Sequence, residues 1–168
     1  VAALASVGQD SSFWTTLAGP GIDQAVQALE PGAHVVPLDE SYLDDIAEAF
    51  GQVVDAKSPY TSGHSTRVAA YTERIATQLG LSTAHTRWLR RGALLHDVGK
   101  LGVSNTVLDK PGKLDANEWA SVQAHAAYTQ DILGRIGAFA ELARISSAHH
   151  ERLDGKGYPL GLASDQIR

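Results

Sequence analysis

The stretch that most constrains the fold is ALLHDVGKLGVSN, residues 93–105, in which an apolar helical run ends in ionisable residues. The apolar residues 93–95 favour a buried helix, yet His96 and Asp97 follow them directly. Burying an imidazole and a carboxylate without partners costs several kcal/mol. The fold must therefore bring other groups to this helix end that satisfy both side chains.

The composition is typical of a globular protein with a core of its own. The chain has 168 residues, of which 43% are hydrophobic and 20% charged, and a domain of about 150 residues buries roughly 70% of its unfolded surface. Cysteine is absent, which excludes disulfides and thiolate metal sites. A net charge of -5 disfavours long nucleic acid as a partner, because that requires clustered cations, but it is compatible with a small phosphorylated ligand.

The sequence shows neither a signal peptide nor an apolar run of membrane-spanning length. It therefore predicts a cytoplasmic protein without a membrane segment.

Apolar periodicity from Leu38 onward predicts an all-α domain of five or more helices, with no alternating strand of useful length. The second of these helices runs from Gly63 to Leu79, with Val68, Ile75 and Leu79 facing inward. The third opens at Ser82, the fourth follows a capping-box pattern at Asp115 and Glu118, and the fifth runs toward His149.

Residues 1–37 are interpreted as a connector or the end of an upstream domain. They contain a short predicted helix from Ile22 to Leu29 and are then broken by Pro31, Gly32 and Pro37. Residues 38–168 form the predicted main domain.

Five of the seven histidines occupy helix ends or apolar helix faces: His64, His96, His125, His149 and His150. The other two, His34 and His85, lie in polar, loop-like contexts and are interpreted as ordinary residues. A single buried histidine is more often a hydrogen-bonded core residue than a ligand, but one shared centre satisfies all five and Asp97 together. Five imidazoles exceed what one four-coordinate ion can use, which favours two first-row metal ions bridged by Asp97.

Four motifs, in this order and spacing, resemble the HD-GYP family of cyclic-dinucleotide phosphodiesterases, a branch of the HD phosphohydrolases. The motifs are VVDAKSPYTSGHSTRVA, LLHDVGKLGV, VSNTVLDKPGKLDANEW and HHERLDGKGYP. The resemblance covers about residues 38–168. It implies an HD-domain-like helical bundle with a C-terminal loop that contains Gly157, Tyr158 and Pro159.

The resemblance also implies a ligand set. His64, His96 and Asp97 match the ligands of a first metal, and Asp97 would bridge to a second metal held by His125, His149 and His150. The implied cofactors are two divalent first-row metal ions. Iron and manganese are favoured, and zinc, nickel and cobalt are alternatives. Some members support a third metal with a glutamate one turn before the first histidine; Tyr60 stands there, so two metals are favoured.

Lys100 matches the family lysine that contacts a substrate phosphate. The Gly-Tyr-Pro loop is expected to pack, with Glu151 and Asp154 holding it, and the resemblance adds that it shapes the site and contacts a partner protein. Family members continue beyond the position of Arg168 with a helix that supplies another aspartate. The sequence is therefore expected to represent a domain truncated at its C-terminus, with one metal ligand missing and its activity correspondingly in question.

The function implied is hydrolysis of cyclic di-GMP, or a related cyclic dinucleotide, to linear pGpG and on to GMP by a hydroxide that bridges the metals. Asp97 and Lys100 are the expected catalytic residues. Two alternatives stay open: a non-catalytic module that binds a cyclic dinucleotide or a partner protein, and an HD hydrolase of other nucleotide phosphate esters. A homodimer is compatible with each of these three functions.

Overall fold

The computed structural model describes residues 10–29, 38–59 and 62–167 of the chain. The chain divides into two compact units, Val1–Pro37 and Leu38–Arg168. In the first unit, α2 (Ser11–Leu17) begins at Asp10, whose side chain accepts hydrogen bonds from the amides of Ser12 and Phe13. It is followed by α3 (Ile22–Gln27), which confirms the short helix expected there.

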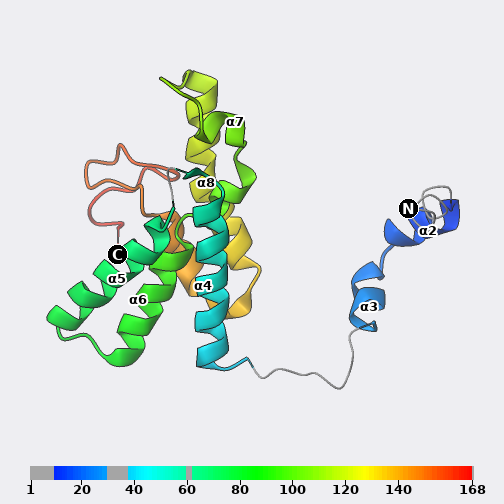
Figure 1. Ribbon diagram of the computed structural model, residues 1–168, viewed down its shortest axis with the longest axis horizontal. Helices are drawn as coiled ribbons and strands as arrows, with labels where there is room; N and C mark the ends of the chain where they lie inside the picture. The colour runs from blue at the N-terminus through cyan, green and yellow to red at the C-terminus, as the bar shows by residue number, and fades with distance from the viewer. Residues whose placement is uncertain (1–9, 30–37, 60–61, 168) are drawn as a thin grey trace. The chain divides into compact units, whose positions relative to one another are not determined.

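The second unit is a bundle of α-helices joined by short 3-10 segments (Figure 1). Its elements are α4 (Glu40–Ala56), α5 (His64–Gln78), α6 (Thr83–Leu95), η2 (Val98–Gly102), α7 (Asn105–Leu108), α8 (Ala116–Gly134), η3 (Gly137–Phe139) and α9 (Ala140–Ser147). In Figure 1, α5 and α6 form a helical hairpin beside α4, and the strongest remaining packing joins α8 to α9 and to η2. The all-α prediction is confirmed, and the described residues contain no β-strand beyond one isolated bridge between Asp154 and Ala163.

Local capping groups set the helix boundaries where the sequence predicts them. The Ser82 side chain accepts from the amide of His85 at the start of α6, and Asp115 and Glu118 form a reciprocal capping box at the start of α8. After α5, Gly80 adopts a left-handed φ of 71°, and the Leu81 amide donates back to the Ala76 carbonyl at 3.0 Å. This is the six-to-one hydrogen bond of a Schellman motif.

The prediction for the inward face of α5 was wrong. Ile75 and Leu79 are 60% and 70% exposed, whereas the buried positions of α5 are the small residues Ser65, Ala69 and Ala76. Small side chains allow two helix backbones to approach closely, so the helix buries its narrow face against α6 and leaves the bulky one outward. The apolar core, to which α5 contributes Ala69, is centred on Leu94, Leu95, Leu133, Phe139 and Leu142.

Within the described ranges, none of the helices is both long and apolar enough to cross a lipid bilayer.

Candidate metal centre

The structure brings all six predicted metal-ligating residues together in two groups. His64, His96 and Asp97 form one group, and His125, His149 and His150 form the other; within each, the potential ligand atoms lie within 4.8 Å of one another. The six come from different parts of the chain: the first residue of α5, the junction of α6 and η2, the middle of α8 and the turn after α9. Asp97 links the groups, because its Oδ2 faces His96 Nε2 at 3.2 Å while its Oδ1 faces His125 Nε2 at 3.4 Å.

Three of the histidines are oriented by the same local hydrogen bond. The Nδ1 atoms of His96, His125 and His149 each contact the carbonyl oxygen three residues earlier, at 2.8, 2.5 and 2.5 Å. Because a carbonyl can only accept, each Nδ1 carries a proton, so each ring, when neutral, offers its Nε2 as a lone pair. A hydrogen bond of this kind fixes the tautomer of a metal-ligating histidine.

The lone pairs therefore converge without a donor between them. His125 Nε2 and His149 Nε2 lie 3.3 Å apart, and both face Asp97 Oδ1, at 3.4 and 3.7 Å. Asp97 Oδ1 is buried and has no hydrogen-bond partner among the described residues. Acceptors packed against each other repel unless a cation lies between them, so the donor set fits a metal ion.

The pKa values agree with neutral imidazoles at His125, His149 and His150. Burial lowers the pKa of His149 to about 3, and burial likewise lowers the pKa of His125 and of His150. His96 differs: burial lowers its pKa, but the hydrogen bond and charge of Asp97 outweigh burial and raise it above the usual value. Neutral imidazole and ionised carboxylate are the protonation states that bind metals.

Lys100 extends over the same carboxylate. Its Nζ donates to Asp97 Oδ2 at 2.6 Å, and the Lys100 side chain is 20% exposed. Burial raises the pKa of Asp97, but His96 and Lys100 more than compensate and hold it well below its usual range. Asp97 is therefore ionised, and a cationic side chain borders the centre.

Thr129 and Gly99 hold η2 against α8. The Gly99 amide donates to Thr129 Oγ1 at 3.0 Å, and that hydroxyl donates to the His96 carbonyl at 3.0 Å. A Cβ at Gly99 would lie 1.9 Å from the His125 carbonyl oxygen, so only glycine allows this approach. Asp97 is thereby held against the imidazoles of α8.

Asp55 anchors the first turn of α5. Its carboxylate accepts from the Ser65 amide at 3.0 Å and from the Ser65 hydroxyl at 2.7 Å. A carboxylate at a helix N-terminus satisfies amides that have no partner in the helix. The bonds fix the backbone next to His64, which is the first residue of that helix.

The C-terminal loop covers the His150 side of the centre. The Tyr158 ring stacks on His150 with centroids 4.5 Å apart and an angle of 24° between the planes. A Cβ at Gly157 would lie 2.4 Å from the Cα of Glu151, so the loop folds tightly on its own start. As expected, Glu151 holds the loop, because its carboxylate accepts from the amides of Leu160 and Leu162 at 2.6 and 2.8 Å. The expected second loop carboxylate, Asp154, pairs with exposed Arg152.

Sequence reasoning missed Asp55 and Thr129, which support the centre without belonging to it. It also placed His85 in a loop, whereas this residue lies in the first turn of α6. Tyr60 and His34 lie outside the described residues, so the argument against a third metal stays a prediction.

A family model described as the HD domain matches residues 48–168. The chain belongs to the HD domain family. This HD domain is 57% identical over 159 residues to 3'3'-cGAMP-specific phosphodiesterase 3 of Vibrio cholerae serotype O1, covering 95% of the chain and 35% of the relative. It is 34% identical over 130 residues to a cyclic di-GMP phosphodiesterase of Thermotoga maritima, covering 76% of the chain and 35% of that relative.

A crystal structure of a cyclic GMP-AMP-specific phosphodiesterase of V. cholerae also matches the HD domain. The TM-score is 0.51 and the identity is 55%, over 87% of this chain and 35% of the crystallised one. The chain thus spans about a third of the length of these relatives. Their names agree with the HD-GYP resemblance of the sequence motifs.

Proposed function

We propose that this HD domain is a metal-dependent phosphodiesterase of cyclic dinucleotides, with 3'3'-cGAMP or cyclic di-GMP as substrate. One observation carries the proposal: the Nε2 atoms of His125 and His149 converge, without a donor, on the buried Oδ1 of Asp97. The names of the two relatives supply the substrate class. Of the two substrates we favour 3'3'-cGAMP, because the relative named for it is 57% identical and the one named for cyclic di-GMP is 34% identical.

The residues divide into two ligand sets that share Asp97. His64, His96 and Asp97 would hold one divalent ion, and the imidazoles of α8 and the turn after α9 would hold the other. Two such cations, when bound, polarise a phosphoryl group and lower the pKa of a water that attacks it. Imidazole and carboxylate ligands suit iron and manganese, and zinc, nickel or cobalt as alternatives.

The chain's own contribution is orientation and charge. The backbone bonds to Nδ1 hold three imidazoles in place before the ligand arrives, so little reorganisation is needed. Lys100, partly exposed beside Asp97, can turn from that carboxylate to a non-bridging phosphate oxygen and offset its negative charge. The chain has no cysteine, and the described side chains around Asp97 are histidines and a lysine, which agrees with direct attack by water.

The test is turnover by anaerobically purified protein loaded with Mn²⁺ or Fe²⁺. The wild-type protein should linearise 3'3'-cGAMP or cyclic di-GMP, and Asp97→Ala should abolish both metal content and product. Asp131→Ala is the matched control, because Asp131 is an exposed carboxylate on α8. Tight binding of the dinucleotide without product would support a receptor instead, and turnover of mononucleotides alone would support another HD hydrolase.

A further inference from the structure

The ring of His150 is held differently from the other two imidazoles of its ligand group. The Nδ1 atoms of His125 and His149 bond to main-chain carbonyls, whereas the structure records no hydrogen bond between the His150 ring and any other described residue. Other rings hold it instead. It stacks on Tyr158, with centroids 4.5 Å apart, and meets the His125 ring edge-on at 5.0 Å. The orientation of His150 therefore depends on where Tyr158 lies.

Tyr158 contacts His150 through both its main chain and its ring. Its amide donates to the His150 carbonyl at 3.2 Å, and its ring stacks on the imidazole with 24° between the planes. The neighbours of Tyr158 in the loop are weakly attached to the helices, because Leu153 and Leu160 are 71% and 76% exposed. The hydrogen bonds to the Glu151 carboxylate stay within the loop. The Tyr158 ring therefore needs a support from the helices.

Trp119, in the first turn of α8, gives that support. Its ring meets the Tyr158 ring edge-to-face, with centroids 6.4 Å apart and 82° between the planes. Aromatic pairs in this arrangement add stability beyond the area that they bury. Tyr158 also meets the His125 ring, at 6.2 Å, but that ring belongs to the centre itself. Trp119 is 48% exposed, so burial in the core does not explain a tryptophan at this position.

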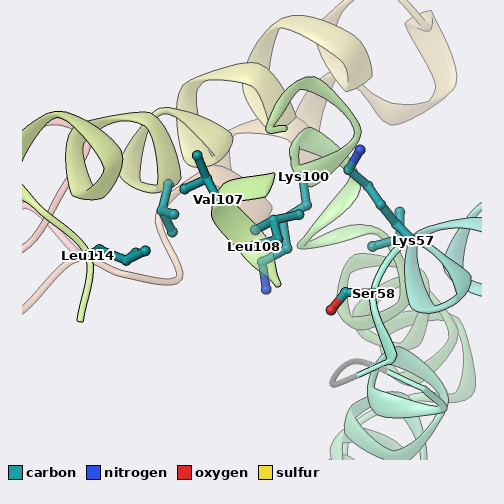
Figure 2. Close-up of a pocket in the computed structure, with 8 residues that line it drawn as sticks. Lys57, Ser58, Lys100, Val107, Leu108 and Leu114 are labelled. Carbon is teal, nitrogen blue, oxygen red and sulfur yellow. The ribbon is translucent and has the colours of Figure 1, made fainter. Parts of the chain in front are cut away.

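The turn that carries Trp119 is fixed independently of the loop. Glu118, in the capping box of α8, also pairs with the Nζ of Lys110 at 2.6 Å. Just before the helix, Leu114 lines a pocket of about 230 Å³ together with Val107 of α7 (Figure 2). The start of α8 is thus attached on two sides, and an aromatic ring on it can hold the loop in place.

We infer that Trp119 is a positioning residue of the candidate metal centre. It supports the Tyr158 ring, which in turn orients His150 for the ion of its ligand set. The inference rests on the metal binding in the proposed function, and it adds a residue that lies outside both ligand sets. The ring of Trp119 acts on metal binding through Tyr158 alone.

A zinc-buffered titration of the protein, followed by NMR of the ¹⁵N-labelled imidazole rings, tests this without requiring turnover. Trp119→Ala should lower the Zn²⁺ affinity read at the His150 ring by roughly 2- to 12-fold, the value of one aromatic pair. Trp119→Phe keeps a ring and should stay within about 2-fold of the wild type. The midpoint read at the His96 ring should shift less, because His96 belongs to the other ligand set.

A second variant separates positioning from general packing. Tyr158→Leu removes the ring that contacts His150 and should lower the same affinity at least as much as Trp119→Ala. The double variant should lose no more than Tyr158→Leu alone, because the two rings act in series. Additive losses would overturn the inference, and so would a His96 midpoint that shifts as far as the His150 midpoint. Either outcome would mean that Trp119 only stabilises the fold.

The control is Tyr71→Leu, which removes an exposed aromatic ring from α5 and should leave both midpoints unchanged. An unchanged His150 midpoint in Trp119→Ala, or a wild-type protein whose His150 ring binds no Zn²⁺, also overturns the inference. Hydrolysis of the cyclic dinucleotide is measured separately. A protein that binds Zn²⁺ as expected but forms no product contradicts the proposed function alone.

Discussion

Replacing Gly99 by alanine should separate η2 from α8 and destabilise the domain. The new Cβ would lie 1.9 Å from the His125 carbonyl oxygen and 2.5 Å from the Thr129 amide nitrogen, where an ordinary contact needs at least 3.4 Å. Both neighbours are backbone atoms of a helix, so neither can rotate away. The two segments must move apart.

The cost can be worked out from two contributions. Overpacking of this kind costs about 1–3 kcal/mol. Separation also breaks the bond from the Gly99 amide to Thr129 and leaves a buried donor unpaired, for about 1–3 kcal/mol more. The free energy of unfolding should therefore fall by about 2–6 kcal/mol, and metal content should fall with it because Asp97 moves away from His125.

Urea unfolding followed by far-UV circular dichroism measures the first quantity. Gly137→Ala is the matched control, because nothing lies within 4 Å of a Cβ built there; it should change stability by less than about 0.5 kcal/mol. If Gly99→Ala unfolded at the same urea concentration as this control, the close approach of η2 and α8 would be refuted.

Three further changes test the supports of the fold and of the centre. Thr129→Val leaves the Gly99 amide without its acceptor and should lower the free energy of unfolding by about 1–3 kcal/mol, whereas Thr129→Ser should retain most of the stability in the same urea titration. Burial raises the pKa of Asp44, but hydrogen bonds from Arg91 and Arg87 outweigh it and lower the pKa. Because the folded pKa is the lower one, this stabilisation is present above about pH 4 and is lost as the pH falls through the folded value. Asp44→Asn should therefore unfold at a urea concentration that depends less on acidification, and an equal dependence would contradict the ion pair. Glu151→Ala removes both acceptors of the C-terminal loop and should speed tryptic cleavage after Arg152, with unchanged cleavage kinetics counting against the clamp.

The sequence was most informative where the interaction is local. Ser82 and the pair Asp115 and Glu118 act within one helical turn, so their pattern predicts the helix starts directly. The six residues of the candidate metal centre could also be predicted, because an imidazole or a carboxylate at the end of an apolar helix needs a partner.

The remaining features depend on contacts between distant residues. Thr129 bonds to Gly99 across 30 positions, and a lone threonine carries no signal of that role. The outward face of α5 was mistaken because hydrophobicity alone ranks Ile75 above Ala76, although close helix packing selects the smaller residue.

The hydrogen bonds that orient His96, His125 and His149 all reach back three residues along the same chain segment. Each imidazole is thus oriented by a main-chain carbonyl three residues earlier, which is present whatever side chain that residue carries. A histidine in this position needs no other side chain to fix its tautomer, because the main chain accepts the Nδ1 proton. Substitutions of Ala93, Val122 or Ser146 that leave the backbone in place should therefore not change the orientation of the imidazoles. A designer who transplanted this centre into another bundle would need to reproduce backbone positions rather than a second layer of side chains.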